Sequence, residues 1–136
     1  MNRFVLDTSI ALAWYLPEDF SPEAQLWLND FLEGRVQFLV PTLHYWEIGN
    51  VLRTYVRRRE LKDTVAREIY ALHLEAPLDV KDPNRETVLD TALEYNATTY
   101  DAVYIALSLS LNIPLLTAER TTTPWVVKLG TLARTL

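Results

Sequence analysis

The strongest constraint on the fold of this chain is its alternation of short apolar runs with longer amphipathic segments. The apolar runs have the length of buried strands, and the segments between them repeat their apolar residues with the period of a helix. Strands that alternate with helices form parallel sheets, because each connection must cross back over the sheet. We therefore predict an α/β fold in which a parallel β-sheet is flanked by α-helices on both faces.

The predicted elements can be placed along the whole chain. The candidate strands are Arg3 to Leu6, Val36 to Val40, Leu78 to Val80, the region Ile113 to Leu116 and, at the edge of the sheet, Trp125 to Leu129. The candidate helices are Thr8 to Tyr15, Ser21 to Glu33, Thr42 to about Arg59, Leu61 to Glu75, Asn84 to Tyr95 and Tyr100 to Leu111. With 136 residues, 49% of them hydrophobic, and no shift in composition, we expect one domain over residues 1–136.

Composition restricts the chemistry and the location. The chain has no cysteine, so any metal must be held by oxygen or imidazole ligands. No apolar stretch has the length of a signal peptide or a membrane span, and we expect the protein to be cytoplasmic. The net charge of −5 alone weighs mildly against a nucleic-acid partner. A bound divalent cation would reverse the local field of clustered carboxylates, so that objection is weak.

Four isolated carboxylates lie where a parallel-sheet fold would end a strand or begin a helix: Asp7, Glu47, Asp101 and Glu119. Asp7 closes the first apolar run, and Glu119 follows the run that ends at Leu116, so both should lie just outside the carboxyl ends of strands. In open α/β sheets, ligands bind at that rim. We predict that the four acids form a metal cage.

Clustered carboxylates need a cation, because two unit charges about 4 Å apart repel by on the order of 4 kcal/mol at an effective dielectric constant near 20. Mg²⁺ or Mn²⁺ would offset this repulsion, and either ion takes carboxylates, waters and substrate phosphate oxygens as ligands. Such an ion lowers the pKa of a bound water for attack on a phosphodiester. The only histidines, His44 and His73, fit neither a zinc spacing nor a catalytic triad.

Each acid also has a structural interpretation. Asp7 is placed to cap a helix, and Asp101 is placed to favour a helix dipole. Glu119 is placed to form an exposed ion pair with Arg120. Glu47 has the weakest structural explanation, since it lies on or beside the apolar face of its helix and needs a partner there.

The four acids lie in the segments Phe4-Val-Leu-Asp-Thr-Ser-Ile-Ala-Leu12, Trp46-Glu-Ile-Gly-Asn-Val-Leu52, Thr99-Tyr-Asp-Ala-Val-Tyr-Ile-Ala-Leu107 and Pro114-Leu-Leu-Thr-Ala-Glu119. These segments closely resemble the PIN-domain family, in particular its small VapC-type members from toxin and antitoxin pairs. Their order and rough spacing are those of the family, and together they cover nearly the whole chain.

The resemblance implies a Mg²⁺-dependent endoribonuclease with Asp7, Glu47 and Asp101 as metal ligands, and Ser9 as a small polar residue that supports the site. Glu119 stands where the family usually has Asp, and its side chain is longer by roughly 1.5 Å. It would therefore bind the metal through a water, shift a second metal, or not participate. The family also implies a VapB-type antitoxin partner, an RNA substrate and a homodimer.

Two other functions stay open. A metal-dependent phosphatase would use a similar sheet, but Asp7 is followed by Thr8 and Ser9 rather than by a second Asp. A catalytically weak PIN fold that only binds RNA or an antitoxin is suggested by Glu119.

Substrate-binding residues are less well marked in the sequence. A basic cluster either binds RNA or a partner, or simply solvates a helix end; its members are Arg53, Arg57, Arg58, Arg59, Lys62 and Arg67. Tyr100 and Tyr104, beside Asp101, either stack on a base or belong to the core. A further set of aromatic side chains carries more apolar surface than one side of a small domain easily buries: Trp14, Tyr15, Phe20, Trp27, Phe31, Trp46 and Tyr55.

Overall fold

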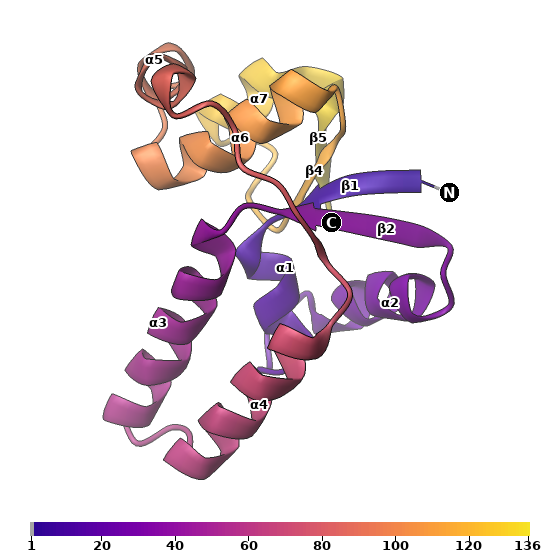
Figure 1. Ribbon diagram of the computed structural model, residues 1–136, viewed down its shortest axis with the longest axis vertical. Helices are drawn as coiled ribbons and strands as arrows, with labels where there is room; N and C mark the ends of the chain where they lie inside the picture. The colour runs from indigo at the N-terminus through magenta and orange to yellow at the C-terminus, as the bar shows by residue number, and fades with distance from the viewer. Residues whose placement is uncertain (1) are drawn as a thin grey trace.

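The chain folds around a parallel sheet of five strands in the order β3-β2-β1-β4-β5 (Figure 1). A computed structural model describes residues 2–136. The strands are β1 (Asn2–Leu6), β2 (Val36–Val40), β3 (Asp79–Val80), β4 (Leu115–Thr117) and β5 (Ala133–Thr135). All four neighbouring pairs are parallel, which confirms the predicted α/β class.

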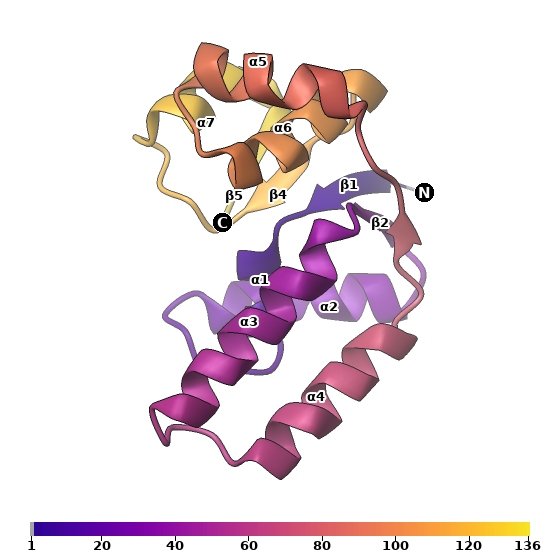
Figure 2. The ribbon, with the colours of Figure 1, turned by 60° about the vertical axis from the view of Figure 1, so that its left-hand side comes forward.

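The helices cover both faces of this sheet. They are α1 (Thr8–Ala13), α2 (Ser21–Leu32), α3 (Leu43–Arg57), α4 (Asp63–Glu75), α5 (Arg85–Tyr95), α6 (Thr99–Leu111) and α7 (Pro124–Leu129), followed by a short 3₁₀ turn, Gly130–Leu132. Helices α1 to α4 lie on one side of the sheet and α5 to α7 on the other (Figures 1 and 2). No helix within residues 2–136 has the length and apolar character needed to cross a membrane.

Alternating side chains of the strands supply separate apolar cores on the two faces. In β1, Leu6 packs in the core beneath α1 to α4, whereas its neighbour Val5 packs in the core beneath α6 and α7. In β4, Leu116 and Leu115 divide in the same way. This period of two is expected for strands that are buried on both faces. The near-continuous apolar runs of the sequence follow from it.

The edge of the sheet was predicted wrongly. Residues Trp125 to Leu129 form helix α7 rather than a strand, and the edge strand is β5. Trp125, Val126 and Leu129 are buried while Val127 is exposed, which is a helical pattern and not the alternation of a strand. Pro124 starts the helix in its first turn, where a missing N–H costs nothing. An apolar run after a Thr-Pro pair was therefore a helix signal.

The strand order places the switch point of the topology between β1 and β4. The chain runs from β1 outward to β2 and β3, and then returns to the other side of β1 with β4 and β5. In sheets of this kind the connections on the two sides diverge at the switch point, and ligands bind outside the carboxyl ends of the strands there. Asp7 follows β1 directly and Glu119 follows β4, so both acids lie at this rim.

Helices α3 and α4 pack against each other as a hairpin that extends away from the sheet (Figures 1 and 2). Gly49 faces Tyr70 across the hairpin, and a Cβ atom at this position would make ordinary van der Waals contact with the Tyr70 ring, at 3.4 Å. The Tyr70 hydroxyl donates to the carbonyl oxygen of Tyr45 across the hairpin, at 3.1 Å. The end of the hairpin carries Arg57, Arg58, Arg59 and Lys62 of the basic cluster.

Candidate active site at the carboxyl ends of the central strands

Asp7 is fixed between the two central strands. Its backbone N–H donates to the carbonyl oxygen of Leu116 at 3.0 Å. Its side-chain Oδ2 accepts hydrogen bonds from Thr117 Oγ1 at 2.7 Å and from Ser9 Oγ at 3.1 Å. Although Asp7 is the residue before α1, its side chain makes no capping hydrogen bond to that helix. The capping interpretation of Asp7 is therefore wrong, and the carboxylate is turned toward β4.

Burial makes the charge of Asp7 costly. It raises the pKa of Asp7 to about 6, against the hydrogen bonds from Thr117 and Ser9, which lower it. The negative charges of Asp101 and Glu47 raise this pKa further, so both carboxylates lie within electrostatic range of Asp7. Three acids that are far apart in the sequence are thus brought to the same rim of the sheet.

Asp101 and Glu119 form the outer part of the site. Asp101 lies in the first turn of α6, where its backbone N–H donates to the Thr98 hydroxyl at 3.1 Å. Burial and the charge of Glu119 raise the pKa of Asp101, whereas a favourable helix dipole would lower it. Glu119 is exposed, and its carboxylate accepts a hydrogen bond from Thr123 Oγ1 at 3.5 Å. The predicted ion pair between Glu119 and Arg120 is not among the ion pairs of residues 2–136.

Glu47, on α3, is held by the hydroxyl groups of Thr8, on α1, and of Tyr104, on α6. Its Oε1 accepts from Thr8 Oγ1 at 2.9 Å and from the Tyr104 hydroxyl at 2.7 Å. The Thr8 and Tyr104 hydroxyl oxygens lie 2.6 Å apart, so the two hydroxyl protons are shared among these three short contacts. Burial and the charge of Glu47 raise the pKa of Tyr104, so this phenol stays protonated and able to donate. Tyr104 is therefore a buried anchor of Glu47 and not a surface for stacking.

Sequence reasoning missed the two histidines beneath the site. His44 Nδ1 is 3.3 Å from both Thr8 Oγ1 and the Tyr104 hydroxyl, and its Nε2 is hydrogen-bonded to His73 Nε2 at 2.9 Å. His73 Nδ1 is hydrogen-bonded to the Tyr15 hydroxyl at 2.8 Å. A continuous chain of hydrogen bonds thus runs from Glu47 through the core to Tyr15.

Burial keeps both rings of this chain neutral. It lowers the pKa of His44 to about 3 and that of His73 to about 4. A neutral imidazole has one donor and one acceptor nitrogen, so one ring donates to the other and all four nitrogens are satisfied. His44 and His73 are 29 positions apart, on α3 and α4, and no spacing rule would have paired them.

A comparison with known families matches residues 4–121 to the PIN domain, which is most of the chain. The protein belongs to the PIN-domain family. This finding confirms the resemblance inferred from the four acidic segments.

Two curated relatives are similar to about half of this chain, and a solved structure is similar to nearly all of it. Ribonuclease VapC1 of Mycobacterium tuberculosis, from strains CDC 1551 / Oshkosh and ATCC 25618 / H37Rv, is 33% identical over 75 residues. The match covers 54% of this chain and 56% of that protein, so the chain spans about half the length of the curated relatives it matches. The crystal structure of PAE2754 from Pyrobaculum aerophilum shares the fold, with a TM-score of 0.74 at 21% identity over 97% of this chain and 82% of that one.

The donor set of the PIN domain fits a hard cation, but not as a cage of four direct ligands. Within residues 2–136, no three Asp, Glu or His side chains are arranged so that they could hold one ion together. Mg²⁺ is commonly held by one or two carboxylates and keeps several waters. Asp7 and Asp101, whose pKa values burial and neighbouring negative charge raise, suit that role. Metal binding by the four acids stays a prediction.

Proposed function

We propose that this PIN domain is a Mg²⁺-dependent endoribonuclease toxin of the VapC type that hydrolyses RNA phosphodiester bonds. The observation that carries the proposal is the environment of Asp7, a carboxylate at the switch point whose pKa is raised to about 6 by burial and by the charges of Asp101 and Glu47. A divalent cation would neutralise this set of charges. The partial similarity to Ribonuclease VapC1 supports RNA as the substrate.

In this mechanism Asp7 and Asp101 would hold the ion, and Glu47 and Glu119 would be further acids beside it. Bound there, Mg²⁺ would polarise a phosphoryl oxygen and lower the pKa of the attacking water. Thr117 and Ser9 orient Asp7 through its Oδ2. Thr8 and Tyr104 occupy Oε1 of Glu47, which leaves its Oε2 available to accept a proton or a hydrogen bond from that water.

Cleavage of transfer RNA and total cellular RNA with Mg²⁺, Mn²⁺ or EDTA tests the proposal. The wild type should produce discrete fragments only with a divalent metal. Asp7→Asn and Asp101→Asn should each lower the rate by on the order of 10³-fold. Undiminished cleavage by either variant would remove that residue from the site. Turnover of a simple phosphomonoester with intact RNA would favour the phosphatase instead.

Metal binding has a readout that does not depend on activity. Saturating Mg²⁺ should raise the melting temperature of the wild type by a few degrees, because the ion binds only the folded site. Asp7→Asn should lose most of this increase. An equal increase in both proteins would place the metal elsewhere.

We include in the proposal a VapB-type antitoxin that inhibits the nuclease, and a homodimer. Helices α2 and α4 flank an apolar hollow of about 390 Å³, whose walls include Trp14, Tyr15, Leu28, Leu32 and Leu72. This hollow supports the antitoxin proposal, because an apolar groove can receive a helix or strand of a partner protein. Co-expression with a candidate VapB-type antitoxin, followed by sedimentation of the complex and of the free protein, would measure both assemblies.

A catalytically weak PIN fold that only binds RNA is the second candidate. Glu119, exposed and placed where the family usually has Asp, favours it. RNA binding that persists in EDTA, without cleavage under any metal condition, would support this function. Glu119→Asp should then create or increase cleavage.

A further inference from the structure

Two aromatic side chains of this protein are exposed to solvent, and they are neighbours. Of its four Trp, seven Tyr and four Phe residues, only Trp46 and Tyr100 are exposed, by 69% and 64%. The other aromatic residues, including most of those near the amino terminus, are buried or half-buried. Exposed apolar side chains are common on protein surfaces, but large aromatic rings usually bury their area in a core or on a ligand.

Trp46 and Tyr100 line the same hollow next to the acids. It has a volume of about 330 Å³ and is lined by Leu43, Trp46, Glu47, Asn50 and Tyr100. Trp46 is on α3 and Tyr100 on α6, so their proximity is a product of the fold and not of one helical stripe. Each precedes a site acid in the sequence, Glu47 and Asp101 respectively. A group held between them would lie directly beside the predicted site of hydrolysis.

The walls of this hollow suit a flat ligand with a polar edge. The two rings offer π-faces, and the exposed Asn50 offers an amide donor and acceptor, since its side chain makes no hydrogen bond within residues 2–136. An apolar protein segment in the same place would remove water from the Glu47 carboxylate without replacing its hydrogen bonds. A nucleobase avoids this cost, because its edge carries donors and its faces stack on aromatic rings.

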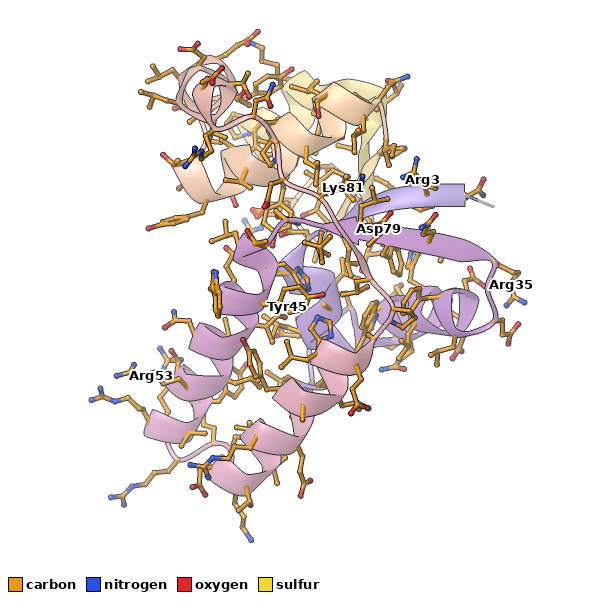
Figure 3. All side chains as sticks on the ribbon, in the orientation of Figure 1. Arg3, Arg35, Tyr45, Arg53, Asp79 and Lys81 are labelled. Atoms are coloured by element: carbon orange, nitrogen blue, oxygen red, sulfur yellow. The ribbon has the colours of Figure 1, made fainter. Side chains whose placement is uncertain are left out.

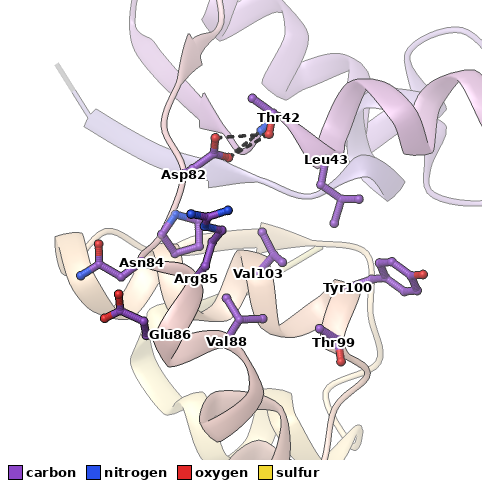
Figure 4. Close-up of a pocket in the computed structure, with 11 residues that line it drawn as sticks. Thr42, Leu43, Asp82, Asn84, Arg85, Glu86, Val88, Thr99, Tyr100 and Val103 are labelled. Atoms are coloured by element: carbon purple, nitrogen blue, oxygen red, sulfur yellow. Dashed lines mark hydrogen bonds between the residues drawn. The ribbon is translucent and has the colours of Figure 1, made fainter.

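Beyond Tyr100 the surface continues into a larger hollow of about 710 Å³, whose wall includes the positively charged side chain of Arg85 (Figure 4). Leu43 and Tyr100 line both hollows, and Arg85 lies across the second one from Tyr100. Asp82 also lines this hollow, and its Oδ1 accepts hydrogen bonds from the Thr42 backbone N–H at 2.9 Å and from Thr42 Oγ1 at 3.1 Å. Arg85 forms no ion pair within residues 2–136 and is available for a phosphate.

We propose that Trp46 and Tyr100 form an aromatic clamp for one unstacked base of single-stranded RNA, next to the phosphate to be cleaved. Asn50 contacts the edge of this base, and Arg85 contacts a phosphate farther along the RNA. The proposal deepens the nuclease function and rests on it. It predicts that the protein selects unpaired RNA, because a base inside a duplex cannot reach the clamp.

Binding in EDTA tests the clamp separately from cleavage. The probe is a fluorescein-labelled single-stranded RNA hexamer of mixed sequence, followed by anisotropy with Trp46→Ala, Trp46→Phe, Tyr100→Ala and Tyr100→Phe. The alanine variants should bind on the order of 10- to 100-fold more weakly, and the phenylalanine variants should keep most of the affinity. Leu93→Ala, which removes an equally exposed apolar side chain from α5, is the matched control and should bind like the wild type.

A second probe identifies the base as the ligand. A hexamer series with one abasic position moved along the strand should show one position at which binding drops in the wild type but not in Trp46→Ala. Alanine variants that bind every hexamer like the wild type would overturn the clamp. So would a change of oligomeric state on sedimentation with unchanged RNA affinity, which would assign the two rings to a protein interface.

Failure of the nuclease proposal would look different. The wild type could bind the hexamer through Trp46 and Tyr100 and still leave all RNA intact with Mg²⁺ and Mn²⁺. This result would support the clamp and overturn the nuclease proposal. A wild type that cleaves RNA at a rate that both alanine variants match would retain the nuclease and remove the clamp.

Discussion

Asp7 is the residue whose environment conflicts most with its charge, and this gives a prediction for stability. Its folded pKa of about 6 lies above the usual value of 3.8, so the folded protein binds this proton more tightly than the unfolded chain does. Asp7 therefore adds to the free energy of unfolding at low pH, and this stabilisation is lost as the pH rises through about 6. In EDTA at pH 7.5, Asp7→Asn should therefore be more stable than the wild type by about 1–3 kcal/mol. Urea unfolding measures the difference.

The control for Asp7 is pH itself. At pH 4 the wild-type carboxyl is protonated in the folded protein, and the advantage of Asp7→Asn should shrink toward zero. A variant that is less stable than the wild type at pH 7.5 would show that the Thr117 and Ser9 hydrogen bonds outweigh the burial of the charge.

The histidine pair gives a prediction of opposite sign. The folded pKa values of His44 and His73, about 3 and 4, lie below the usual 6.5, so the unfolded chain binds more protons in acid. Stability should fall as the pH drops from 6.5 toward 4.5, by up to about 1.4 kcal/mol per pH unit for each ring. Asp7 offsets part of this fall below pH 6.

His73→Gln isolates this effect, since glutamine keeps hydrogen-bonding groups but does not titrate. It should be less stable than the wild type at pH 7 and should lose less stability between pH 6.5 and 4.5, measured by urea unfolding at each pH. Parallel pH profiles for the two proteins would mean that His73 is protonated in the folded state.

The sequence located the acids of the site but not their supports. Asp7 and Glu119 could be placed because residues after parallel strands meet at one edge. The contacts of Glu47 with Thr8 and Tyr104, and of His44 with His73, join side chains from different helices. Such contacts follow from packing angles and rotamers, which leave no periodic pattern in a sequence.

At the scale of the element, helix α6 carries both a predicted metal ligand and the anchor of another. Asp101 and Tyr104 are three residues apart and so lie on one face of this helix. Tyr104→Phe removes the hydroxyl that donates to Glu47 at 2.7 Å and leaves the ring in the core. Cleavage should fall on the order of 10- to 100-fold, as for other groups that orient a metal ligand.

The melting temperature separates orientation from folding in this test. Tyr104→Phe should stay folded, with a change of about 1 kcal/mol in the free energy of unfolding. Tyr95→Phe, which removes a phenol hydroxyl from the last residue of α5, is the matched control and should cleave like the wild type. Equal activity of the Tyr104→Phe variant would make Thr8 the only anchor that Glu47 needs.

The end of α3 holds a residue in a conformation that its side chain does not favour. Arg59 has a φ of 59°, and the bonds from Arg59 N–H to Val56 O (3.0 Å) and from Glu60 N–H to Tyr55 O (2.9 Å) form a Schellman motif. Arg59→Gly should stabilise the protein by about 0.5–1 kcal/mol. Arg58→Gly, at a helical φ of −80°, should destabilise it. Thermal unfolding of both variants decides whether the backbone or the charge of Arg59 matters more.

The elements themselves were largely predictable, and the one wrong element shows why. The apolar runs Phe4–Leu6 of β1 and Phe38–Val40 of β2 predicted these strands, because burial on both faces of a sheet produces such runs. Helix α7 has an apolar run of similar length, so composition alone could not separate it from a strand. Its capping residues did carry the distinction. Strand β5, three residues with a central arginine, is set by pairing with β4 and has no signal of its own.

At the scale of the whole molecule, the basic cluster lies at the far end of the α3–α4 hairpin, away from the acidic rim (Figure 3 labels Arg53 on this arm). Ten helical residues, about 15 Å, separate Glu47 from Arg57. A long structured RNA held at the site can extend along α3 to this end. We therefore expect the arginines to contribute phosphate contacts to the binding of transfer RNA.

Neutralising three of them, in Arg53→Gln/Arg57→Gln/Arg58→Gln, should reduce the slope of log Kobs against log salt by up to about 2, at roughly 0.7 per single-strand phosphate contact. Arg35→Gln is the matched control, because Arg35 lies at the opposite side of the molecule in Figure 3 and is paired with Asp30 at 2.9 Å. Its slope should equal that of the wild type. If the triple variant also kept the wild-type slope, the cations would serve only the helix end and its hydration, and RNA would be held by the acidic rim and the residues around it alone.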